Sequence, residues 1–120
     1  MRRLEAVADE VKVCGGKAID FEAALGWLRR KWGVKRLLCE GGGELNNALF
    51  RAGLVNELHL TVCPKIFAGR CAPTISEGKA DLSLANATVL KLKSARRAGG
   101  ELFLVYKLVK GEPVANTPSA

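Results

Sequence analysis

Residues 34–64 read VKRLLCEGGGELNNALFRAGLVNELHLTVCP, a pattern that predicts a strand, a glycine turn, a short helix and a second strand. Residues 36–39 end an apolar run of the kind that a buried strand uses. Three glycines, Gly41 to Gly43, follow at once, and without Cβ atoms the backbone there can take a positive φ and approach a ligand closely. The helix expected from Glu44 then directs its N–H groups and the positive end of its dipole at this turn, which favours a bound phosphate.

The helix after the glycines has one apolar face, and the chain then returns as a strand. That face consists of residues at helical spacing, namely Leu45, Ala48, Leu49 and Ala52. Gly53 lies where this helix is expected to end. From Glu57 to Cys63 apolar and polar side chains alternate, which predicts a strand with two different faces.

The residues before this stretch predict a further strand and helix. Val11 to Cys14 is typical of a short strand. Asp20 is a good N-cap for a helix over residues 21–31, and Gly33 can end that helix. Residues 11–39 therefore predict a strand–helix–strand unit with a parallel, right-handed crossover.

The residues after it predict a loop and a hairpin. Residues 65–78 are irregular and contain Gly and Pro, and the length of this loop predicts a functional role. Residues 87–95 and 101–108 flank Gly99-Gly100, which predicts an antiparallel hairpin. The tail at 111–120 has no pattern and is expected to be loose.

Together these elements predict one α/β domain over residues 1–110. The order β-α-β-α-β and a hairpin predicts a mostly parallel sheet with helices on its faces and an antiparallel C-terminal hairpin. A chain of 120 residues with 48% hydrophobic composition is long enough to form a hydrophobic core. Ligands of such sheets bind beyond the carboxyl ends of the parallel strands, where the glycine turn is expected to lie.

Composition and charge narrow the class of partner. The formal net charge of +7 favours an anionic partner such as a phosphorylated small molecule, whereas aromatic residues are too few to favour nucleic acid. The four cysteines form no CxxC pair and the one histidine is not spaced from them as a ligand, so reduced thiols are predicted and no metal site. No signal peptide or membrane-spanning run is recognisable, and a cytoplasmic protein is expected.

The segment at 37–78, LLCEGGGELNNALFRAGLVNELHLTVCPKIFAGRCAPTISEG, resembles the reductase half of the riboflavin-biosynthesis deaminase/reductase enzymes. The resemblance rests on Glu40 with the glycines after it, on the run from Gly53 to Leu58, and on Pro64 and Gly69. It extends more loosely over residues 1–110. It implies a dihydrofolate-reductase-like fold and the NADPH-dependent reduction of 5-amino-6-(5-phosphoribosylamino)uracil, or its deamination-related analogue, to the ribitylamino compound.

The same resemblance implies which residues form the site. Glu40 is the implied substrate contact. The implied cofactor-binding residues are those of the glycine turn and the helix start, namely Gly41, Gly42, Gly43, Glu44, Leu45, Asn46, Asn47 and Ala48. It identifies no catalytic acid and no metal ligand in this chain. A tight turn without a ligand is the alternative for the glycines, and a carboxylate that only faces the helix dipole is the alternative for Glu40.

The chain departs from the family pattern in two ways. The matching pattern lacks a large amino-terminal portion of the family's domain, and the zinc signature of the deaminase half is not found. An incomplete sheet leaves an open edge, so a homodimer is expected. A reductase with another substrate and a catalytically inert nucleotide-binding or structural module are the remaining alternatives.

Overall fold

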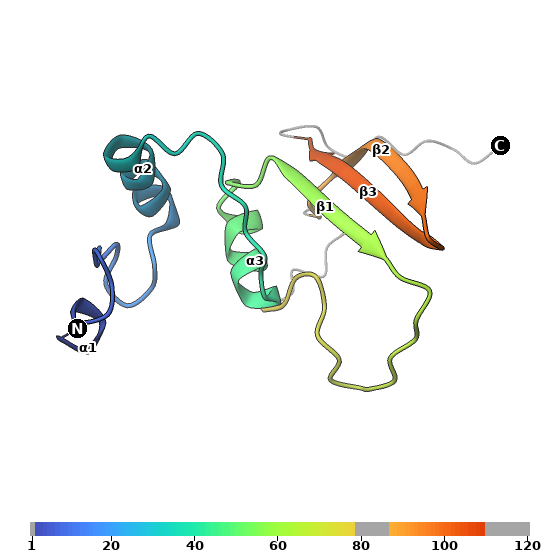
Figure 1. Ribbon diagram of the computed structural model, residues 1–120, viewed down its shortest axis with the longest axis horizontal. Coiled ribbons are helices and arrows are strands. Elements are labelled where there is room, and N and C mark those ends of the chain that lie inside the picture. Colours follow the sequence, from blue (N-terminus) through green and yellow to red (C-terminus); the bar gives the residue numbers. More distant parts are fainter. Residues whose placement is uncertain (1, 79–86, 110–120) are drawn as a thin grey trace. The chain divides into compact units, whose positions relative to one another are not determined.

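A computed structural model of the chain describes residues 2–78 and 87–109 (Figure 1). The chain divides into two compact units, Met1–Glu40 and Gly41–Ala120. The predicted tail at 111–120 lies outside the described residues, as do residues 79–86.

The first unit contains the helices α1, Arg2–Glu5, and α2, Phe21–Trp32. Both ends of α2 follow the local prediction. Asp20 caps the start, because its Oδ1 accepts a hydrogen bond from the N–H of Ala23 at 2.9 Å. Gly33 ends the helix with a φ of 64°, a left-handed value at which glycine carries no Cβ penalty.

The parallel strands predicted in this unit are not formed. Residues 11–14 and 36–39 are neither helix nor strand, and the parallel sheet is therefore not confirmed. The backbone of a strand needs hydrogen-bonding neighbours along its length. The N–H of Asp20 donates to the carbonyl of Cys14 at 3.1 Å and a single bridge joins Gly15 to Ile19, but the described sheet contains only β1, β3 and β2. Leu38 is 76% exposed, so the buried strand predicted there is not seen among the described residues.

The second unit begins with α3, Gly43–Arg51, as the apolar spacing predicts. Gly42 is its N-cap, and Gly53 follows its end with a φ of 65°. The N–H of Leu54 then donates to the carbonyl of Leu49 at 3.1 Å, which satisfies one of the last carbonyls of the helix.

Three strands form an antiparallel sheet with β3 between β1 and β2 (Figure 1). They are β1, Glu57–Val62, β2, Leu90–Ala98, and β3, Glu101–Leu108. The predicted strand and hairpin are thus confirmed, with Gly99 and Gly100 at the turn at φ values of 57° and 86°. Residues 65–78 contain no helix or strand, as expected of a loop.

The predicted hydrophobic core is not present in the described part of the chain. No described side chain is buried, although several helix and strand residues are half-buried. Trp32, the last residue of α2, is 57% exposed, and Leu45 and Ala52 of the expected α3 face are also exposed. The apolar pattern is therefore formed in the helices but only partly covered, since each apolar face needs another layer to bury it.

Candidate functional site

The glycine turn enters α3 through Gly41 and Gly42. Gly41 has a φ of 87°, in the left-handed region that favours glycine. Gly42 has an extended backbone, and no heavy atom lies within 4 Å of the position that a Cβ would take there. The Gly42 side of the turn is open, which a closely approaching ligand requires.

The first turn of α3 presents N–H groups that the helix does not use. The N–H of Asn46 donates to the carbonyl of Gly42 at 2.9 Å. Within residues 2–78 and 87–109, the N–H groups of Gly43, Glu44 and Leu45 donate no hydrogen bond. Unsatisfied N–H groups and the positive end of the helix dipole together favour an anion at this end of α3.

Residues 74–78, here called the strap, are hydrogen-bonded to the start of α3. The N–H of Glu77 donates to the carbonyl of Gly43 at 3.0 Å. The side-chain Nδ2 of Asn46 donates to the carbonyl of Ile75 at 2.9 Å. The strap therefore contacts both the backbone and a side chain of the first helical turn, from a loop about thirty residues later in the chain.

Two glycines allow this close contact between the strap and the helix. A Cβ on Gly43 would lie 2.6 Å from Cγ and 2.7 Å from Cδ of Glu77. The Glu77 side chain is itself held, because its Oε1 accepts a hydrogen bond from the N–H of Thr74 at 2.7 Å. Gly78 has a φ of 142°, and a Cβ there would overlap the side-chain amide of Asn47. The absence of a Cβ on Gly43 therefore makes room for Glu77 of the strap. The absence of a Cβ on Gly78 makes room for Asn47 of the helix.

The predicted cofactor-binding residues, Gly41 to Ala48, are brought together in the second unit as one turn and the first turns of α3. Glu40 is exposed and ends the first unit.

The sequence pattern predicted a functional role for the loop at 65–78 but did not identify the polar side chains of the strap. Ser76, whose Oγ donates to Oδ1 of Asn47 at 3.3 Å, is one of them. The available signal was a polar run that ends in a glycine.

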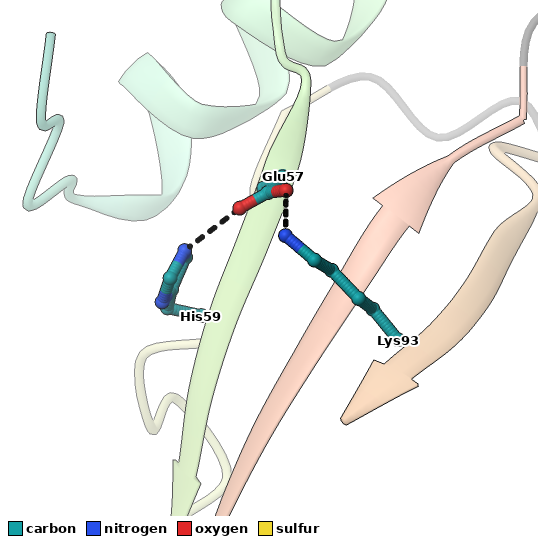
Figure 2. A network of polar contacts seen from close by, with 3 residues as sticks. All are labelled: Glu57, His59 and Lys93. Carbon is teal, nitrogen blue, oxygen red and sulfur yellow. Dashed lines mark hydrogen bonds and ion pairs between the residues drawn. The ribbon is translucent and has the colours of Figure 1, made fainter. Parts of the chain in front are cut away.

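A second group of polar side chains lies on the sheet, where Glu57 sits between His59 and Lys93 (Figure 2). Nζ of Lys93 donates to Oε1 of Glu57 at 2.6 Å, and Nε2 of His59 lies 3.4 Å from Oε2. Lys93 comes from β2 at the position where its register with β3 shifts. The hydrogen bond from Lys93 holds the pKa of Glu57 below its usual value. The three side chains are partly exposed, as in an ordinary surface ion pair.

The pKa of the Cys63 thiol is raised, which makes this cysteine less reactive as a nucleophile. A hydrogen bond with the Glu101 carboxylate raises the pKa of Cys63. A thiol with a raised pKa is a poor nucleophile at neutral pH. None of the four cysteines is paired in a disulfide.

The part of the chain that the structure describes has neither a metal-ligand cluster nor a membrane-spanning helix. In the described ranges no three His, Cys, Asp or Glu side chains gather as a metal site. No helix in those ranges has the length and apolar character needed to cross a membrane.

The fold resembles solved pyrimidine-reductase structures. A pyrimidine reductase-like protein from Corynebacterium diphtheriae aligns with a TM-score of 0.75 at 26% identity, over 92% of this chain and 43% of that chain. RibD of Acinetobacter baumannii aligns with a TM-score of 0.68 at 19% identity, over 78% of this chain and 26% of that one. These likenesses place the chain in an α/β class of reductase folds.

The sequence comparison defines the family. The chain belongs to the RibD C-terminal domain family, whose model matches residues 2–104. It is 36% identical over 102 residues to a 2,5-diamino-6-ribosylamino-4(3H)-pyrimidinone 5′-phosphate reductase of Methanothermobacter thermautotrophicus. That alignment covers 85% of this chain and 46% of the relative. A reductase of the same name from Aquifex aeolicus is 31% identical over 109 residues, 91% of this chain and 48% of the relative. The chain thus spans about half the length of these curated relatives.

Proposed function

We propose that this chain is part of an NADPH-dependent pyrimidine reductase of riboflavin biosynthesis. The reaction would reduce the phosphoribosylamino group of a pyrimidine to the corresponding phosphoribitylamino group. Support comes from the family and from relatives named as reductases of a ribosylaminopyrimidinone 5′-phosphate. The observation that carries the proposal is the open turn at Gly42, followed by three N–H groups without a partner in the described residues.

The residues of the turn fit the diphosphate of a dinucleotide. A side chain at position 42 would occupy space that is open in this structure, and the α3 N–H groups supply donors for phosphate oxygens. NADPH supplies a hydride when bound. Residues Gly41 to Ala48 would bind and orient its diphosphate, and Glu40 would accept hydrogen bonds from substrate hydroxyl or amino groups. The net charge of +7 favours both anionic ligands.

The finer features of the fold belong to the same proposal. We propose that residues 34–39 pair as a parallel strand in a dihydrofolate-reductase-like sheet, because Leu37 and Leu38 are exposed apolar side chains in a segment that is neither helix nor strand here, and a sheet covered by a second layer would bury them. We also propose a homodimer, since β1 and β2 are edge strands of the described sheet. Sedimentation of the purified chain across a range of concentrations tests the dimer, and a monomer at all of them would contradict it.

A catalytically inert nucleotide-binding module is the second candidate. It is favoured by the lack of any buried side chain among the described residues. Such a chain would keep the turn while lacking a closed pocket for the substrate.

Titration with NADPH followed by an assay with substrate separates the two candidates. NADPH is expected to raise the Tm of the chain, because a ligand that binds only the folded state stabilises it. Loss of the absorbance of reduced nicotinamide on adding the ribosylaminopyrimidine phosphate supports the reductase. A Tm shift without that loss supports the inert module, and no Tm shift at millimolar NADPH contradicts both.

A further inference from the structure

The strap places a carboxylate at the positive end of α3, beside the turn proposed to bind the cofactor. Oε1 of Glu77 lies 2.9 Å from the position of a Cβ on Gly43, so the carboxylate contacts the first residue of the helix. In the described residues Oε1 is a hydrogen-bond acceptor for Thr74, a member of the strap itself. The charge is therefore fixed in place by the loop that carries it.

The two sides of the turn differ as a result. Beside Gly43 the approach is filled by Glu77, whereas beside Gly42 nothing lies within 4 Å of a Cβ position. A fixed negative charge repels a phosphate that approaches from its own side, and the repulsion is stronger where water is partly excluded. The open side at Gly42 carries no such charge among the described neighbours.

We propose that Glu77 is a positioning residue of the cofactor turn: it holds the strap on the first turn of α3 and directs the diphosphate to the Gly42 side. This inference rests on the proposed function. The strap also restrains Asn46 and Asn47 through Ile75 and Ser76, so the geometry of the helix start depends on it. A preorganised turn loses less freedom when the ligand binds.

Two substitutions separate the two roles of Glu77. Glu77→Gln keeps the size of the side chain and an oxygen acceptor for Thr74, but removes the charge. It is expected to lower the Kd for NADPH by roughly threefold at low salt, with the difference shrinking at high salt because screening weakens the repulsion. Glu77→Ala removes the acceptor as well and releases the strap, so it is expected to raise the Kd by about tenfold.

The experiment measures the Kd for NADPH by calorimetry at low and high salt for the wild type and both variants. Glu101→Gln, a change of the same charge at the start of β3, is the matched control and is expected to leave the Kd unchanged. Thermal unfolding of each variant shows whether it is folded, and Glu77→Gln tests the charge even where Glu77→Ala does not fold.

The outcomes distinguish this inference from the proposed function. A wild-type chain that does not bind NADPH removes the proposed function, and the inference with it. A wild-type chain that binds NADPH, with Glu77→Gln binding no more tightly at low salt, overturns the inference alone. A lower Kd that is equal at all salt concentrations, or is shared by Glu101→Gln, also overturns it, because the effect would then not come from a charge at the turn.

Discussion

Gly42 and Gly43 are adjacent and chemically identical, yet they have different environments. Gly42 faces open space, whereas Gly43 is in contact with the side chain of Glu77. A side chain at Gly42 would enter open space where a ligand could bind, whereas a side chain at Gly43 would clash with Glu77 of the protein itself. It can be measured by enlarging each glycine in turn.

Gly42→Val is expected to abolish NADPH binding with little loss of folding stability. No heavy atom lies within 4 Å of the Cβ position at Gly42, and the added side chain fills the space proposed for the diphosphate. Calorimetry gives the Kd, and thermal unfolding gives the Tm. Gly16→Val is the matched control, because Gly16 also has no heavy atom within 4 Å of its Cβ position and lies outside the turn. Unchanged affinity in Gly42→Val would remove the turn from the binding site.

The ion pair of Glu57 and Lys93 gives a pH-dependent contribution to stability. The pKa of Glu57 is lowered from 4.5 in the folded chain, mainly by the hydrogen bond from Lys93. A carboxyl group with a lowered folded pKa stabilises the fold above its unfolded pKa and loses that contribution as the pH falls through the folded value. The stabilisation is therefore present at neutral pH and absent in acid well below 4.5.

Lys93→Met is accordingly expected to lower the Tm slightly at neutral pH, by an amount that disappears in acid. Thermal unfolding at both pH values measures the difference from the wild type. Lys91→Met is the control, because Lys91 lies on the same strand and its side chain makes no ion pair among the described residues. A Tm difference that persists in acid would show that Lys93 acts through packing rather than through its charge.

At the level of secondary-structure elements, α3 and the strap form one contact although they are distant in sequence. The helix ends were predictable, because caps such as Asp20 and Gly33 act on residues three or four positions away. The hairpin of β2 and β3 was predictable for the same reason, since Gly99-Gly100 sets its turn. The strap contact was not, because no local pattern pairs Glu77 with Gly43.

A double substitution tests the contact between the helix and the strap. Gly43→Ala is expected to cost about 1–3 kcal/mol, because its Cβ would overlap the Glu77 side chain. Glu77→Ala removes the overlapping atoms, so the cost of Gly43→Ala should largely vanish in the double variant. Urea unfolding of the four proteins gives the coupling free energy. Costs that simply add would show that the two residues are not in contact.

At the level of the whole molecule, the exposed apolar side chains are the main departure from what composition suggested. Ile66 is 99% exposed and Phe67 is 86% exposed, and no side chain is buried in the described ranges. A chain with 48% hydrophobic residues has enough apolar material for a core. Composition counts apolar residues, whereas burial needs a second layer against each face.

The dilute chain is therefore expected to bind an apolar fluorescent dye in its native state. It is also expected to unfold in urea with an m-value below that of a closed domain of 120 residues, because m scales with the surface exposed on unfolding. Dye fluorescence and a urea titration at low protein concentration measure both. A steep transition without dye binding would mean that the apolar faces are covered.

The sequence alone determined the features that depend on neighbours along the chain: the ends of α2, the glycine turn with α3 behind it, the hairpin, and the family to which the pattern belongs. Only the tertiary structure decided that residues 11–14 and 36–39 are neither helix nor strand in the described chain, that Glu77 lies against Gly43, and that the apolar faces are only partly covered. The physical reason is that caps and turns are satisfied within a few residues. A strand pair, a helix–loop contact or a core requires a partner from elsewhere, which no local pattern can supply.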